Sequence, residues 1–86
     1  MKYIVRYFLV DDRFEKDFFL CEQVMFMTPI IPQIKQTVDL WGIINIKVDD
    51  YNINYDNFIV NKIEYIYLSS EEMMIDIFIT GNYFPE

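Results

Sequence analysis

The alternation of apolar and polar residues near the C-terminus is the feature of this sequence that most constrains its fold. Within residues 72–80 every second residue is apolar, at Met73, Ile75, Ile77 and Ile79. This period of two places the four side chains on one face of a β-strand, because successive side chains of a strand point to opposite faces. Residues 59–68 are rich in β-branched and aromatic residues, and the polar residues 69–71 predict a hairpin turn between the two segments.

Further strands are predicted in both halves of the chain. Residues 2–10 alternate in the same way, and in residues 43–48 the even-numbered positions are apolar. After Asp49–Asp50 the phase changes, and the odd-numbered positions of residues 51–55 are apolar. One continuous strand cannot bury both sets on the same face, so we expect a turn or a bulge at Asp49–Asp50. Gly81–Asn82 is expected to end the last strand.

Residues 31–41 carry a helical signal. The apolar residues that share one face at helical spacing are Ile31, Ile34, Val38 and Trp41. Pro32 suits the first turn of a helix, and Gly42 suits its C-terminal cap. The pattern predicts a three-turn amphipathic helix that packs on the sheet.

Residues 13–27 fit two interpretations. As a helix, the segment has a capping box in Asp12 and Glu15. As a strand, it pairs with residues 2–10 in a hairpin, and the scatter of its aromatic residues around a helical wheel favours this second interpretation. The sequence therefore predicts one α+β domain over residues 1–86. Its small curved antiparallel sheet has four or five strands packed on one or two helices, in the order ββαβββ or βααβββ.

The composition is that of a folded chain with more apolar residues than a domain of this size can bury. Hydrophobic residues make up 53% of the 86 positions and aromatic residues 19%, which excludes intrinsic disorder. So short a chain leaves part of its apolar residues exposed, where they would serve an interface with a partner or a second copy. The apolar runs are far shorter than the roughly 20 residues of a membrane-spanning helix. The single cysteine, Cys21, cannot form an internal disulfide, so we expect a cytoplasmic location, in the host cell for a phage product.

The residues needed for catalysis are scarce. The chain has no histidine, the commonest general base and metal ligand. Its two glycines exclude a glycine-rich phosphate loop. The run from Asp50 to Asp56 resembles the start of a calcium loop, but Tyr55 stands at the position of the turn glycine and Asn61 at that of the bidentate glutamate. We therefore expect no enzyme, no metal site and no cofactor.

The acidic residues are unevenly distributed. Residues 1–38 have no net charge, whereas residues 39–86 carry all of the net charge of −7. Such a charge disfavours direct binding of nucleic acid and favours a basic partner protein. The candidate partner-binding residues combine carboxylates and tyrosines of the later strands: Asp49, Asp50, Tyr51, Tyr55, Asp56, Glu64, Glu71, Glu72 and Asp76.

Two functions are compatible with these features. The first is a non-catalytic acidic inhibitor that imitates the phosphate charge of DNA and occupies the basic cleft of a nucleic-acid-binding enzyme. A phage or mobile-element protein that blocks host defence, in the manner of anti-CRISPR inhibitors, would act in this way. The alternative is a homo-oligomeric assembly or antitoxin-like interaction module without an inhibitory role. Its dimer would form through strand edges or through outer faces that carry Phe8, Met74 and Phe78.

Overall fold

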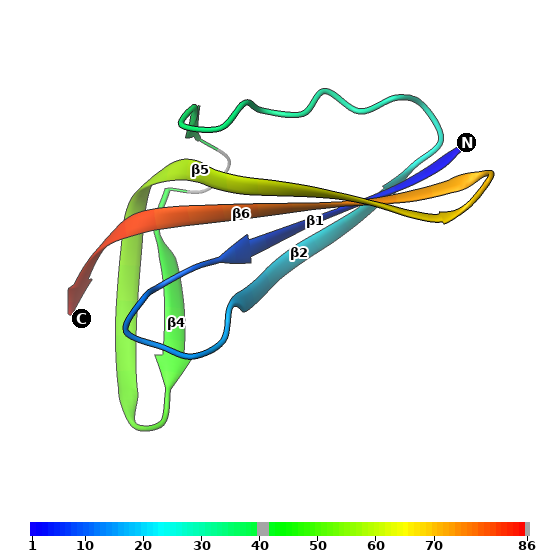
Figure 1. Ribbon diagram of the computed structural model, residues 1–86. Helices are drawn as coiled ribbons and strands as arrows, with labels where there is room; N and C mark the ends of the chain where they lie inside the picture. Colours follow the sequence, from blue (N-terminus) through cyan, green and yellow to red (C-terminus); the bar gives the residue numbers. More distant parts are fainter. Residues whose placement is uncertain (40–41, 86) are drawn as a thin grey trace.

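All the regular structure in the computed structural model, which describes residues 1–39 and 42–85, is β-structure, and six strands form one mixed sheet (Figure 1). The strands are β1 (Lys2–Leu9), β2 (Phe18–Met25), β3 (Thr37–Val38), β4 (Ile44–Val48), β5 (Tyr51–Ser69) and β6 (Glu72–Pro85). The α+β prediction is therefore wrong, because no helix lies in the described residues. Accordingly, no candidate membrane-spanning helix lies in this part of the chain.

The strand order is β2-β1-β6-β5-β3, and β4 pairs separately with β5. The prediction of a hairpin between residues 2–10 and residues 13–27 is confirmed, since β1 and β2 are antiparallel neighbours. The hairpin of β5 and β6 is confirmed as well. The sheet is not wholly antiparallel, however, because β1 and β6 pair in parallel from Lys2↔Glu72 to Leu9↔Ile79. Alternation along a strand reports which residues share a face and carries no information on the direction of its neighbour.

The predicted helix over residues 31–41 is an extended segment that ends in β3, and Trp41 lies outside the described residues. The backbone N–H of Lys35 donates to the carbonyl of Val60, and the N–H of Val60 donates to the carbonyl of Gln36. In a helix these backbone groups would bond within the segment. Here they bond to Val60, at the edge of β5. The flanking Pro29 and Pro32 also favour extended backbone in the residues that precede them.

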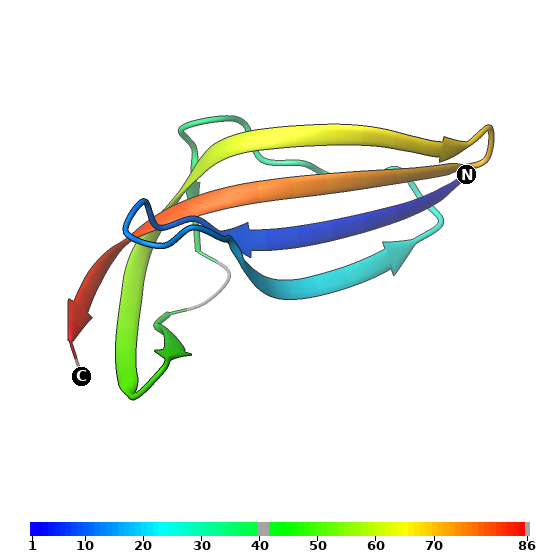
Figure 2. The ribbon, with the colours of Figure 1, turned by 60° about the horizontal axis from the view of Figure 1, so that its bottom comes forward.

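This extended segment covers one face of the sheet. We call that face the covered face; its buried residues include Val5, Leu9, Ile75, Ile77 and Ile79. Residues 26–36 run across it from β2 toward β5 (Figures 1 and 2), and Ile31 packs against the buried core. The predicted inward face of residues 72–80 is thereby confirmed at its three isoleucines. Figure 2 looks onto the opposite face, the open face, which lies uncovered along most of its length.

A bend in β5 gives the molecule its second feature, a projecting β4–β5 hairpin (Figure 1). The pairing with β6 is irregular between Asp56 and Ile59, where Asn57 has a positive φ of 53°. The bend divides β5 into a part that lies in the main sheet and a part, Tyr51–Asp56, that pairs with β4 and the end of β6. β6 continues past Gly81 to Pro85 to complete this pairing, so the prediction that Gly81–Asn82 ends the strand is wrong.

Gly81 is required at the bend because the Phe58 ring lies against it. A Cβ atom built on Gly81 would come within 2.9 Å of Cδ1 and Cε1 of Phe58 and 3.0 Å of the Asp56 carbonyl oxygen. Phe58 is buried in the core, and the carbonyl belongs to the backbone, so neither atom group has room to move.

We expect Gly81→Ala to lower the free energy of unfolding by about 1–3 kcal/mol, because the added methyl group overpacks the bend. Gly42→Ala is the matched control, since a Cβ there meets no atom within 4 Å and should change stability by less than about 1 kcal/mol. Urea denaturation of both variants measures the difference. Equal midpoints would show that the bend adapts to a side chain at position 81.

Candidate protein-binding site

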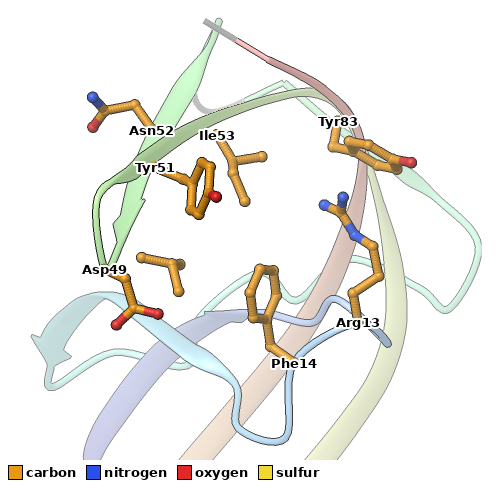
Figure 3. A pocket seen from close by; sticks show the side chains of 8 residues that line it. Arg13, Phe14, Asp49, Tyr51, Asn52, Ile53 and Tyr83 are labelled. Atoms are coloured by element: carbon orange, nitrogen blue, oxygen red, sulfur yellow. The ribbon is translucent and has the colours of Figure 1, made fainter.

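The β4–β5 hairpin and the loop that follows β1 line an open cavity of about 440 Å³ (Figure 3). Its lining residues are Arg13, Phe14, Val48, Asp49, Tyr51, Asn52, Ile53 and Tyr83. The hairpin supplies one wall, the loop the other, and Tyr83 of β6 closes the side near Arg13. The volume lies within the range of small-ligand and side-chain pockets.

The loop wall is held by a network centred on Asp11. Arg13 donates from Nη2 to Oδ2 of Asp11 at 2.6 Å and from Nε to Oδ1 at 3.0 Å. The hydroxyl of Tyr55 donates to Oδ2 of Asp11 at 2.6 Å, and this bond joins the loop to the bent part of β5. The Arg13 guanidinium also stacks on Tyr83, with its central carbon 3.4 Å from the ring centroid. A charge-assisted, two-pronged pair of this kind fixes direction as well as distance.

These contacts shift the pKa values of the three groups in consistent directions. The hydrogen bonds from Arg13 hold the pKa of Asp11 well below its usual range. The same pair raises the pKa of Arg13. Burial and the hydrogen bond to Asp11 raise the pKa of Tyr55 to about 12. At neutral pH the network therefore contains one carboxylate, one guanidinium and one protonated phenol, with no net charge.

The tip of the hairpin carries two acids next to the cavity. Val48 and Tyr51 pair across the strands, which leaves Asp49 and Asp50 as the two turn residues. Asp49, the first turn residue, has a positive φ of 53°, which aspartate tolerates better than most residues. The predicted turn at this position is confirmed. Neither carboxylate forms an ion pair with a described residue, and the Tyr51 side chain beside them is 73% exposed.

The predicted partner-binding residues do not form one patch. Asp49, Asp50 and Tyr51 lie together at the tip of the β4–β5 hairpin. Glu71 and Glu72 lie at the turn between β5 and β6, at the other end of a molecule whose longest dimension is 43 Å (Figure 1).

The remaining predicted residues lie between these two ends, on β5 and β6. Tyr55, 1% exposed, is a core residue bonded to Asp11. Asp76, 4% exposed, is paired with Arg6. Asp56 is half-buried at the bend, and Glu64 is exposed and paired with Lys62 at 3.0 Å. Among the nine, the hairpin tip is therefore the place where acids and an exposed tyrosine meet beside a cavity.

The open face carries the residues of the assembly hypothesis. Phe8 and Phe78 stack with their centroids 5.2 Å apart, and the Lys62 ammonium lies 4.6 Å from the Phe78 centroid. Arg6 joins Asp76 through bonds of 2.8 and 2.7 Å and covers Phe8. These neighbours leave Phe78 only 7% exposed. Exposed apolar residues also lie on this side of the sheet at the edge strand β2, where Phe19 pairs with Phe8 and Val24 with Ile4.

Most of the cavity was not foreseen from the sequence. Arg13 and Phe14 fell in a segment with two interpretations, and Tyr83 lay beyond the expected end of the last strand. These residues are distant in the chain from Val48 and Ile53, and they meet because β6 lies between β1 and β5. Local sequence patterns do not predict contacts between residues that are distant in the chain.

Two other candidate chemistries find no support in the described residues. No group of three or more histidine, cysteine, aspartate or glutamate side chains there is arranged to hold a metal ion. Cys21 is half-buried on β2, and burial raises the pKa of its thiol, which disfavours the reactive thiolate. Comparison of the chain with protein-family models, with curated proteins and with solved structures gives no significant match.

We expect Asp11→Asn to lower the free energy of unfolding at pH 7 by about 1–2 kcal/mol, because the charge-assisted bonds to Arg13 and Tyr55 are weakened. The parent carboxylate has a pKa below its ordinary value of 3.8, so its contribution is complete above that value and is lost as the pH falls below it. The difference between variant and parent should therefore shrink below about pH 4. Urea denaturation from pH 7 to pH 2.5 measures it.

Asp12→Asn is the control for this experiment. It removes the same charge from the neighbouring, exposed residue, which has no ion pair with a described residue. A variant at position 12 as unstable as the one at position 11 would contradict the role assigned to the network.

Proposed function

We propose that this chain is a non-catalytic, acidic protein-binding domain that docks onto a basic protein through the tip of its β4–β5 hairpin. The observation that carries the proposal is the association of an uncompensated pair of carboxylates, Asp49 and Asp50, with the exposed Tyr51 ring at the mouth of an apolar cavity. Energetically dominant interface residues are typically aromatic anchors that fill pockets, and charged groups around them steer the encounter.

The charge distribution supports a basic partner. Four of the seven basic residues form ion pairs within the domain: Lys2 with Glu72, Arg6 with Asp76, Arg13 with Asp11 and Lys62 with Glu64. Their charges are thus locally cancelled, and the net charge of −7 comes from the other acids, which outnumber the three remaining lysines. Such a field accelerates encounters with a cationic surface and is weakened by salt.

The clefts of proteins that hold nucleic acid are strongly cationic surfaces, because arginine and lysine contact phosphates there. Carboxylates at a projecting tip are suited to replace phosphates in such a cleft. We therefore propose that the domain inhibits a nucleic-acid-binding enzyme of a host, and that it belongs functionally with anti-defence proteins of phages or mobile elements.

The position of the acids provides a charge-matched test of the docking tip. We expect D49K/D50K to weaken partner binding by tenfold or more, because two attractive charges beside the cavity become repulsive. E71K/E72K makes the same change in net charge at the opposite end and should change affinity less than threefold. A partner is first recovered from host lysate on the immobilised domain at low salt and identified by mass spectrometry. Its affinity for the three proteins is then measured by calorimetry, and its DNA or RNA binding is assayed with and without the domain.

Equal weakening by both double variants would show that only net charge matters and would contradict a docking tip. A recovered partner that is not basic, or whose nucleic-acid binding is unchanged by the domain, would contradict inhibition by charge mimicry.

A second function, self-assembly, is favoured by the edge strand β2. β2 pairs with β1 on one side only, and two of its apolar residues, Phe19 and Val24, are exposed. An unprotected edge with exposed apolar residues is a template for pairing with another strand. Two copies joined antiparallel through β2 about a two-fold axis would form one continuous sheet.

For this second function we expect a dimer at micromolar concentration that Phe19→Lys converts to a monomer, because a charge on the edge opposes pairing. Light scattering of parent and variant measures the mass. Ile34→Lys is the control, since Ile34 is equally exposed but lies outside β2. A monomeric parent would exclude self-assembly through β2. A substitution of Phe78, on the outer face first considered for a dimer, would not test this pairing, because Phe78 is buried within one copy.

A further inference from the structure

The cavity at the hairpin has one uncompensated charge. Two of its lining residues are charged, Arg13 and Asp49, and they lie on opposite sides of it (Figure 3). The charge of Arg13 is neutralised by Asp11 at 2.6 Å. Asp49 forms no ion pair with a described residue, so the rim on its side presents a free negative charge above apolar walls. A ligand complementary to this cavity has an apolar stem and a positive group.

The aromatic residues that line the cavity already contact one guanidinium group, that of Arg13. The guanidinium of Arg13 lies 3.4 Å from the Tyr83 centroid and 5.6 Å from that of Phe14. Tyr51, on the other wall, has no stacking partner among the described residues, and its ring faces the same cavity. Planar guanidinium groups stack on tyrosine more readily than ammonium groups do.

We propose that the cavity receives an arginine side chain of the basic partner. The aliphatic stem lies against Val48 and Ile53, and the guanidinium stacks on Tyr51 and pairs with Asp49. This assignment rests on the proposed function and names the group on the partner that the docking tip recognises. It also explains why an apolar cavity adjoins an acidic turn, since an arginine needs both.

The test uses n-butylguanidinium chloride, which reproduces the arginine stem and head, and n-butylurea, its uncharged counterpart of nearly equal shape. Each is titrated at constant ionic strength into the 15N-labelled full chain, and amide shifts are followed by NMR. We expect saturable shifts for butylguanidinium at residues 13–14, 48–53 and 83. Butylurea should bind at least about threefold more weakly, as expected for one exposed ion pair with a cation–π contact.

Asp49→Asn and Asp50→Asn form the matched pair of variants. Both remove one negative charge from the same turn, but Asp49 lines the cavity and Asp50 does not. Asp49→Asn should weaken butylguanidinium binding about threefold, and Asp50→Asn less than 1.5-fold, the scale of one exposed ion pair. Equal binding of the urea, equal effects of the two variants, or shifts located elsewhere would overturn the assignment.

The experiments distinguish a failure of the arginine site from a failure of the docking tip. If butylguanidinium does not bind but D49K/D50K still abolishes partner binding, the arginine site is wrong and the docking tip stands. If butylguanidinium binds as expected but D49K/D50K leaves partner affinity unchanged, the cavity binds guanidinium groups and the proposed docking function is wrong.

Discussion

The bend of β5 at Asp56–Ile59 is the constraint on which the rest of the structure depends. Without the irregular pairing there, Tyr51–Asp56 would continue the main sheet as a flat extension with no loop beside it. The bend instead turns this part of β5 so that the Tyr55 hydroxyl meets Asp11 at 2.6 Å. It is permitted by two local features, the left-handed Asn57 and the absence of a side chain at Gly81 beneath the Phe58 ring. The corner is thus held from both sides, and the hairpin tip projects from the main sheet (Figure 1).

The parallel pairing of β1 and β6 depends on a second interaction, the ion pair of Arg6 and Asp76 on the open face. Asp76 is nearly inaccessible although Figure 2 shows no segment over this part of the sheet, and both of its carboxylate oxygens accept hydrogen bonds from Arg6. A slip of β1 by two residues would keep every face assignment but would place Met74 or Phe78 opposite Arg6. Asp76 would then be buried without its partner, at a cost of several kcal/mol. The pair therefore selects one register among those that the hydrophobic pattern allows.

Some elements of the fold were predictable from the sequence and others were not. The face shared by Ile75, Ile77 and Ile79 was predictable because alternation is a local property of a strand. The direction of the neighbouring strand was not, since it depends on which segments meet. The helix predicted at residues 31–41 failed because inward positions at Ile31 and Val38 suit an extended chain crossing a sheet as well as a helix. What decided between them was the open edge of β5 near Val60, a long-range feature. The acidic turn at Asp49–Asp50 was visible in the sequence, whereas the cavity beside it was assembled by the topology.

The ion pairs and the docking tip are two consequences of one distribution of charge. Each arginine of the domain is held by a carboxylate, and each pair performs a structural task, at the strand register for Arg6 and at the loop wall for Arg13. Both arginines are thus used inside the domain, and acids without such partners are displayed at the β4–β5 and β5–β6 turns. Because the two acidic turns lie at opposite ends of the molecule, a single cationic surface of ordinary interface size meets one of them at a time. The turn with apolar walls beside it gains desolvated contacts in addition to charge attraction, and these contacts distinguish a specific complex from a salt-sensitive encounter.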